Sequence, residues 1–237
     1  MNAAVGRRLL AEFTGTGLLV AIVVGSGIFA TRLTADPALR LLINSLVTAL
    51  GLAVLILVFI SVNGAQFNPV VTAVDWILGR HTSHSYGLGI AGATVVSQVA
   101  GAIGGSALAD TMFGAPVLQA STHHRGGIPL LVGEVVATAG LLLVIVALAR
   151  TDRMQHVAWA VGAWIGAAYW FTSSTSFANP AVTIGRSLTD TYAGIAPVSI
   201  PAFIAAQIVG GAIGAALAVV LYPLHTRGRA EEAPLAG

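Results

Sequence analysis

Six stretches of this chain are apolar and long enough to cross a lipid bilayer, and together they take up more than half of its length. A membrane-spanning helix needs roughly 20 apolar residues. A transmembrane barrel needs short segments of alternating hydrophobicity, which the sequence does not contain. We therefore predict an all-α membrane protein with six transmembrane helices. The expected spans are approximately Leu9–Ala30, Leu39–Val62, Tyr86–Ala109, Pro129–Ala149, Val157–Ser174 and Pro197–Tyr222.

The composition agrees with a lipid environment. Charged residues make up 8% of the 237 residues, against about 25% in an ordinary soluble domain. So few charges cannot cover a folded chain of this size with polar surface, which excludes a soluble enzyme, a nucleic-acid-binding protein and a disordered chain. The net charge of +2 gives no indication of a nucleic-acid partner. The absence of Cys excludes disulfides, thiol catalysis and thiolate metal sites.

The arginines predict the orientation, because cytoplasmic loops of membrane proteins carry an excess of basic residues. With both termini in the cytoplasm, seven arginines fall inside and four outside. The inner set is Arg7, Arg8, Arg80, Arg150, Arg153, Arg227 and Arg229, and the outer set is Arg32, Arg40, Arg125 and Arg186. We therefore expect cytoplasmic termini, with residues 223–237 forming a short charged tail.

The chain also repeats itself. The order Glu, Asn-Pro, Gln-x-x-Gly-x-x-x-Gly occurs twice, from Glu12 to Gln98 and from Glu134 to Gln207. We predict one membrane domain over residues 1–222, with a first repeat at about 9–109 and a second at about 129–222. Each repeat has three spans, so the second must be inserted upside down relative to the first. Inverted repeats with a broken hydrophobic segment in each half typically hold a site near the bilayer midplane.

Two segments are too short to span and too apolar for ordinary loops: Gly64–Gly79 and Ser176–Leu188. Each contains Asn-Pro, and Pro is favoured at the first position of a helix with Asn directly before it. We predict two half-helices that enter from opposite faces and meet at the centre. Their N-termini carry partial positive charge, and the Asn side chains offer amide donors to a passing oxygen while the dipoles oppose cations and protons.

Glu12 and Glu134 lie in hydrophobic spans, where a carboxylate is costly. Their symmetric positions favour a structural role, in which each accepts backbone N–H groups from one re-entrant loop. A proton relay is the alternative for the two carboxylates, and a pair of kinked turns is the alternative for the Asn-Pro sequences. His123 and His124, with Asp110 nearby, are residue types of a weak metal site, but a solvated loop explains them better, and we expect no metal.

These motifs resemble the aquaporin and glycerol-facilitator family, also called major intrinsic proteins. The segment GAQFNPVVT is similar to the family's first signature, SGxHxNPAVT. The resemblance covers the chain from Leu9 to Tyr222. It implies a bundle of six transmembrane helices plus two half-helices, a pore in every subunit, a homotetramer, passive transport and no cofactor. The motif residues are Asn68, Pro69, Val70, Asn179, Pro180 and Ala181.

The sequence departs from the family pattern at three places. Val70 stands where the first motif usually has Ala, and Gln66 replaces a frequent His. The second motif usually continues with Arg, which lines the narrow outer filter of the family, but here that position is Val182. Arg186 follows four residues later. We expect Arg186 to lie at the surface or to anchor a loop, and the alternative is that it reaches the outer vestibule.

The resemblance also indicates the other filter positions, counted from the two motifs. They fall on Thr48, Ala167 and Ser176, in addition to Val182, and none of the four is large or charged. We therefore expect a wide filter without arginine, unless an aromatic such as Trp170 or Phe171 turns inward.

The resemblance implies a passive channel for water and small neutral solutes, either glycerol-like or metalloid and arsenical, in a bacterial inner membrane. Members without the filter arginine resemble a subgroup associated with metalloid and arsenical resistance. A water-selective aquaporin is one alternative. A secondary transporter with inverted repeats is another, and such a transporter is expected to place ionisable residues beside its substrate. A membrane enzyme has little support.

Overall fold

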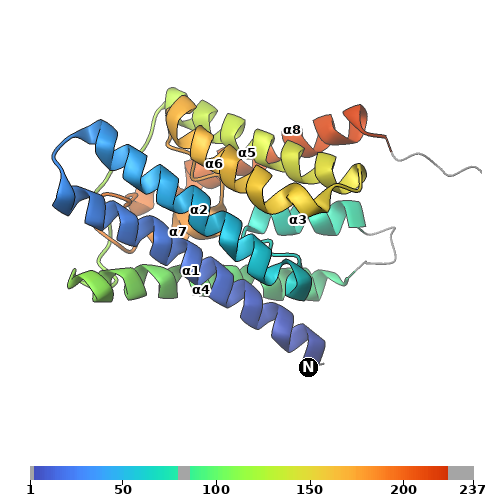
Figure 1. Ribbon diagram of the computed structural model, residues 1–237, viewed down its shortest axis with the longest axis horizontal. Coiled ribbons are helices and arrows are strands. Elements are labelled where there is room, and N and C mark those ends of the chain that lie inside the picture. The colour runs from blue at the N-terminus through green and yellow to red at the C-terminus, as the bar shows by residue number, and fades with distance from the viewer. Residues whose placement is uncertain (1–2, 80–85, 224–237) are drawn as a thin grey trace, which may run out of the picture.

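The computed structural model describes residues 3–79 and 86–223, and over these residues every regular element is a helix (Figure 1). The elements are α1 (Ala3–Leu33), α2 (Pro37–Asn63), α3 (Pro69–Gly79), α4 (Leu88–Phe113), α5 (Ile128–Arg150), η1 (Met154–His156), α6 (Val157–Phe171), α7 (Pro180–Arg186), η2 (Pro197–Ser199) and α8 (Ile200–Leu221). The predicted all-α membrane fold is confirmed. Arg80, Arg227, Arg229 and the tail beyond Pro223 lie outside the described residues.

Five of the six expected spans are helices long and apolar enough to cross a membrane: α1, α2, α4, α5, and η2 continued by α8. The remaining expected span, Val157–Ser174, contains α6. This helix has 15 residues and is therefore only about 22 Å long at 1.5 Å per residue. Polar residues shorten it at both ends. Gln155 and His156 lie in the 3₁₀ turn before it, and the run Thr172–Ser176 leaves helical geometry after it.

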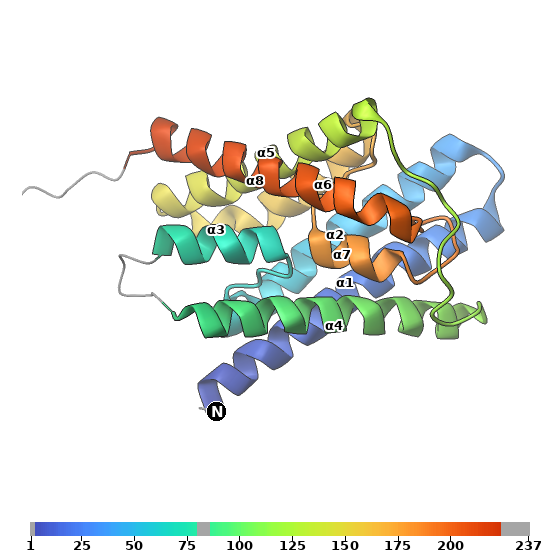
Figure 2. The same ribbon diagram turned by 180° about the vertical axis from the view of Figure 1, so that it is seen from behind.

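The two repeats pack in the same way. α1 lies along α4, and α5 lies along α8 (Figure 2). Both contacts depend on glycines in the second helix of the pair, because a Cβ at these positions would collide with backbone carbonyl oxygens of α1 or α5. Small residues are common where transmembrane helices approach closely. The four glycines are Gly101, Gly105, Gly210 and Gly214.

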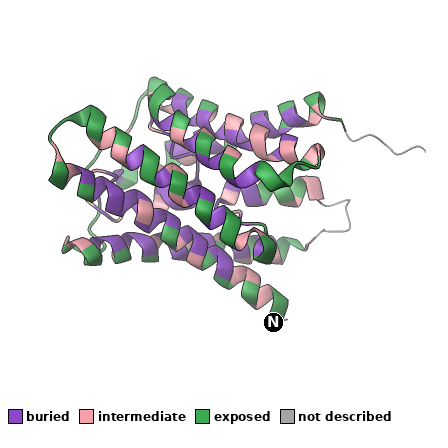
Figure 3. Cartoon of the chain, viewed as in Figure 1, coloured by how far each residue is buried: buried purple, intermediate pink, exposed green. Residues whose placement is uncertain are grey.

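The half-helices α3 and α7 lie in the middle of the bundle, with their N-termini together and their C-termini pointing to opposite ends (Figures 1 and 2). α2 ends at Asn63 because Gly64 adopts a left-handed conformation (φ 85°), which turns the chain into the first re-entrant loop. Buried positions gather on the inner faces of the long helices, and exposed apolar positions cover the outside (Figure 3). This outer surface is the part that faces hydrocarbon.

Candidate functional site

The two Asn-Pro motifs meet at the centre of the bundle. Asn179 caps α7, where its Oδ1 accepts the N–H groups of Ala181 at 3.0 Å and Val182 at 3.2 Å. Asn68 Oδ1 accepts the N–H of Val70 at 3.0 Å in the same way. Each asparagine therefore uses its oxygen to satisfy the free donors at the start of a half-helix.

The amide nitrogens of the same two asparagines tie the loops together. Asn68 Nδ2 donates to the carbonyl of Ala178 at 2.7 Å, and Asn179 Nδ2 donates to the carbonyl of Phe67 at 2.7 Å. An asparagine amide carries two hydrogens, so one hydrogen on each side chain is left over. Both asparagines line the central cavity, and the remaining amide hydrogens can therefore meet an oxygen atom inside it.

Glu12 holds the first re-entrant loop from behind. Its Oε1 accepts hydrogen bonds from the Gln66 N–H (3.0 Å) and Asn63 Nδ2 (2.8 Å). Its Oε2 accepts from the Phe67 N–H (2.8 Å) and Gln98 Nε2 (2.6 Å). The carboxylate is fully buried, and four donors satisfy it, as a buried charge requires.

Glu134 holds the second loop with nearly the same geometry. Its Oε1 accepts from the Phe177 N–H (2.9 Å), and its Oε2 accepts from the Ala178 N–H (2.8 Å) and Gln207 Nε2 (2.6 Å). Gln207 also donates to Thr183 Oγ1 at 2.9 Å, as Gln98 does to Thr72 Oγ1 at 2.9 Å. The structure thus brings each Glu to the backbone N–H groups expected for it.

These hydrogen bonds decide where the loop carbonyls point. In a planar trans peptide the C=O lies opposite the N–H, so N–H groups directed at a glutamate turn the preceding carbonyls away from it. The carbonyls of Ala65, Gln66, Ser176 and Phe177 therefore face the cavity that these residues line. The loops contain non-glycine residues in the left-handed region, among them Ala65 (φ 51°) and Ser176 (φ 52°). Such conformations cost about 1–3 kcal/mol each and are retained at functional sites.

A cavity of about 90 Å³ runs through the centre of the bundle. A single water needs roughly 10–15 Å³ of such space, so the cavity has room for a row of several water molecules. Polar groups of the lining come from the two re-entrant loops and from Thr48, Tyr169 and Arg186. The other lining side chains are apolar: Leu19, Val23, Leu52, Ile56, Val71, Leu141, Ile145, Met154, Val157, Val161, Ile165 and Val182.

Three of the four expected filter residues lie in this lining: Thr48, Ser176 and Val182. Ala167 does not, and its selection was wrong. The lining residues of α6 are Val157, Val161, Ile165 and Tyr169, spaced four apart on one face. Ala167 lies two residues from the nearest of these, about 200° around the helix, and it is exposed on the outer surface.

An aromatic side chain does turn into the cavity, and it comes from Tyr169. Its hydroxyl lies 3.4 Å from Thr48 Oγ1, and only 3% of the residue is exposed. The two aromatics considered from the sequence, Trp170 and Phe171, point outward with about half of their surface exposed. Tyr169 therefore adds a large side chain to a lining for which the sequence predicted only small filter residues.

Arg186 is buried rather than at the surface. Its Nε donates to the carbonyl of Ala193, and its guanidinium stacks on the ring of Phe177 at 3.4 Å from the centroid. Its bond to Ala193 agrees with the expected role of a loop anchor. It also lines the central cavity, which agrees with the alternative that it reaches the vestibule, because its spacing of four residues from Val182 puts the two side chains on one face of α7.

The remaining motif residues support the half-helices from outside the cavity. Pro69, Pro180 and Ala181 begin the two helices. Val70 packs against Gly211 of α8, where a Cβ would collide with the valine side chain. The substitution of Val for Ala in the first motif is therefore matched by a glycine in the helix opposite.

These features can be compared with known proteins. The family model described as Major intrinsic protein matches residues 2–156. The chain belongs to the major intrinsic protein family. A curated relative from Rhizobium meliloti (strain 1021), Aquaglyceroporin AqpS, is 48% identical over 211 residues, which cover 89% of this chain and 88% of that protein.

Other relatives agree with this assignment. A probable aquaporin of TIP type from Medicago truncatula is 30% identical over 76% of this chain and 74% of that one. The X-ray structure of the aquaglyceroporin from Plasmodium falciparum superimposes with a TM-score of 0.65, covering 92% of this chain and 95% of that one. The sequence identity in this pair is 19%, so the match shows the fold alone. The members of the major intrinsic protein family are membrane channels and not enzymes.

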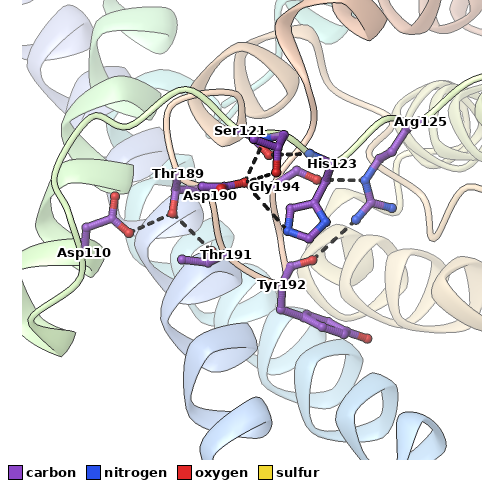
Figure 4. Close-up of polar contacts among 10 residues, drawn as sticks. Asp110, Ser121, His123, Arg125, Thr189, Asp190, Thr191, Tyr192 and Gly194 are labelled. Atoms are coloured by element: carbon purple, nitrogen blue, oxygen red, sulfur yellow. Dashed lines mark hydrogen bonds and ion pairs between the residues drawn. The ribbon is translucent and has the colours of Figure 1, made fainter.

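At the end of the bundle toward which α7 points, the segment Thr189–Gly194 lies against the long α4–α5 connection (Figure 4). Arg125 Nε donates to the carbonyl of Gly194 at 2.8 Å, and Asp110 accepts from Thr189 Oγ1 at 2.7 Å. Burial lowers the pKa of Arg125. Asp190 accepts the N–H and hydroxyl of Thr122, which lowers the pKa of this carboxyl.

The histidine pair considered as a weak metal site belongs to the α4–α5 connection at this end of the bundle. His123 Nε2 lies 3.9 Å from Asp190, while Asp110 faces Thr189 instead (Figure 4). In the portion of the chain that the structure describes, no group of three or more His, Cys, Asp or Glu side chains could hold a metal ion.

Proposed function

We propose that this protein is a passive channel for small neutral solutes and water. One observation carries the proposal. Two half-helices meet N-terminus to N-terminus in a continuous cavity, and Asn68 and Asn179 each retain an amide hydrogen there. The positive helix ends and the amide donors favour an oxygen atom of water or of a hydroxylated solute at this point, and they oppose cations.

The lining supports polar, uncharged cargo. Loop carbonyls supply acceptors, and the two asparagines supply donors at the centre. Most of the remaining lining is apolar, so it cannot replace the hydration shell of an ion. A solute that combines hydroxyl groups with carbon matches a lining of this kind.

The positions of the two membrane carboxylates argue against a proton-coupled transporter. Glu12 and Glu134 are fully buried and directed at the loop backbones. Neither contributes to the cavity lining. We propose that both act as anchors of the re-entrant loops, and flux should not depend on a proton gradient.

The solute class follows from the relatives and the outer lining. Two of the relatives are named Aquaglyceroporin AqpS and, from Citrobacter freundii, Propanediol uptake facilitator PduF. Small polyols and neutral metalloid or arsenical hydroxides are therefore the solutes we assign to this channel. Thr48, Ser176 and Val182, together with Tyr169, would form its selectivity filter. A water-selective channel is the second candidate, because Tyr169 narrows the lining at the level of Thr48.

The protein would act as a homotetramer in the bacterial inner membrane, with both termini in the cytoplasm. The apolar outer surface suits lipid and neighbouring subunits, and the arginine distribution supports the orientation. Cross-linking of the protein in native membranes tests the tetramer, and protease accessibility of tags on each terminus tests the orientation.

Stopped-flow swelling of proteoliposomes tests the transport proposal. Gradients of water, glycerol and neutral arsenite are compared with those in empty liposomes, with and without an imposed proton gradient. We expect all three to permeate faster than the empty-liposome controls, with no effect of the proton gradient. Permeation of water alone would favour the water-selective channel. Flux that follows the proton gradient would favour the transporter.

A further inference from the structure

The outer end of the cavity contains a cation that is not at the usual place in the motif. Val182 and Arg186 are four residues apart on α7, and both line the cavity. One turn of helix separates them, about 5.4 Å along the axis. The side chain of Arg186 therefore faces the same lumen as Val182, closer to the outer mouth.

Two contacts fix the guanidinium in one orientation. The Nε atom donates to the carbonyl of Ala193, and the plane of the group stacks on Phe177, which in turn contacts Phe203 edge-to-face. The two terminal nitrogens have no acceptor among residues 3–79 and 86–223. Four N–H donors on a rigid, planar group are thus left to interact with the contents of the cavity.

The charge also has no carboxylate within 4 Å among the described residues, and Glu134 acts on it only from a greater distance. In the described part of the chain the one pair of opposite charges within 4 Å is His123 and Asp190, and it does not include Arg186. A second guanidinium, Arg125, lies over the same ring of Phe177 at 5.1 Å and bonds the carbonyls of Gly194 and Tyr192. Burying an unpaired cation costs free energy. A purely structural role for Arg186 does not explain why this position carries a charge.

We propose that Arg186 is the selectivity cation of this channel, displaced by one helical turn toward the outer mouth relative to Val182. The inference rests on the proposed channel function. Its fixed charge repels cations and hydrated protons in a low-dielectric passage. Its terminal nitrogens donate to the oxygens of an entering solute opposite Tyr169 and Thr48. Arg125 is a positioning residue, since it holds the carbonyl segment that orients Arg186.

Three variants separate this role from that of a loop anchor. Arg186→Met keeps an unbranched side chain and removes the charge and all donors. Arg186→Lys keeps the charge and loses the planar fork. The double variant Val182→Arg/Arg186→Met moves the cation one turn inward. Arg40→Met is the matched control, because Arg40 also donates Nε to a loop carbonyl on the outer side (Thr34, 2.7 Å) but does not line the cavity.

Sodium flux and solute swelling are measured on the same proteoliposomes, normalised to inserted protein. We expect Arg186→Met to raise sodium flux about tenfold or more, since one fixed charge in a low-dielectric pore is removed. Arg186→Lys should still exclude sodium but lose selectivity among hydroxylated solutes. The double variant should restore the exclusion of sodium. Arg40→Met should behave as wild type.

The following results would overturn the proposal. Unchanged sodium flux in Arg186→Met, or a leak in the double variant equal to that of Arg186→Met, would assign Arg186 to loop anchoring alone. If Arg186→Met fails to insert, a sodium-permeable Arg186→Lys would overturn the proposal by itself. A wild type that excludes sodium but passes no solute would contradict the channel function instead, and the two failures are thus distinguishable.

Discussion

The two re-entrant loops are built on the same plan but face different mouths of the channel. Each loop has two N–H groups on a buried glutamate, a glutamine from a later helix on the same carboxylate, and an asparagine that reaches the opposite loop. The residues two before and seven after each asparagine contact one another in both halves. In the first half Gln66 donates to Asp75 at 2.7 Å, and in the second half Phe177 stacks on Arg186.

The two halves share the residues that hold the loops and differ in the residues near the two mouths. The Glu, Gln and Asn positions that hold the backbone are the same in the two halves, because both loops must present carbonyls to one lumen. The positions near the mouths have diverged. On the α3 side a carboxylate bonds an amide and a tyrosine with Arg8 over its ring, and on the α7 side two guanidiniums lie over one phenyl ring. Variants in the scaffold should change stability, and variants at the mouths should change selectivity.

The largest effect is expected from the glutamates. Glu12→Gln keeps one acceptor oxygen but leaves two of four donors unsatisfied, whereas Glu134→Gln can satisfy two of its three donors. Each orphaned buried donor costs about 1–3 kcal/mol. We expect both variants to lower the folded yield and thermal stability in detergent, Glu12→Gln more than Glu134→Gln, with solute selectivity retained. Unchanged yield together with pH-independent transport would instead favour a proton relay.

The next effect tests the outer mouth. Val182→Arg adds a second guanidinium to the lining, one turn deeper than Arg186. Because the lumen there is already limited by Tyr169, glycerol flux should fall by about tenfold or more, while water flux falls less. Swelling assays normalised to inserted protein measure both, with Val182→Leu as the control for bulk without charge. Equal proportional losses for glycerol and water would contradict a filter at this position.

The sequence predicts most of this scaffold, because its signals are local. Apolar length identifies the spans, and Asn-Pro identifies the starts of the half-helices wherever the fold places them. The mouths were less predictable. Ala167 was wrong because the lumen-facing side of α6 depends on how the helix is rotated in the bundle. For Arg186 the loop-anchoring role was expected but a surface position was also considered, because its contacts with Phe177 and Ala193 form only when the loop after α7 folds back.

A smaller effect on stability is expected from the one support of the loops that differs between the two halves. Asn63 gives Glu12 its fourth donor and accepts the N–H of Ala65 at 2.9 Å, while the corresponding residue of the second half, Ser174, accepts only the N–H of Ser176 at 3.2 Å. Asn63→Ala should cost about 1–3 kcal/mol, since it leaves a buried N–H unsatisfied. Ser174→Ala should cost less. Thermal unfolding of the two variants in the same detergent makes the comparison, and a greater loss for Ser174→Ala would contradict it.

The smallest effect concerns Asp190 in the outer loop. The N–H and hydroxyl of Thr122 favour its ionised form and hold the pKa of this carboxyl below its usual value of 3.8. A carboxyl with a lowered folded-state pKa contributes stability that is fully present above the unfolded pKa, near 4, and is lost as the pH falls through the folded value. Asp190→Asn keeps an oxygen acceptor for Thr122, so its cost at neutral pH should be small. Thermal unfolding is compared from pH 7 to pH 3 for Asp190 and Asp190→Asn, both in a His123→Gln background that removes the neighbouring imidazole. The difference in stability between the two proteins should shrink only below about pH 4. A difference that is constant over the whole range, or that shrinks near neutral pH, would mean that this carboxylate does not stabilise the outer loop through its charge.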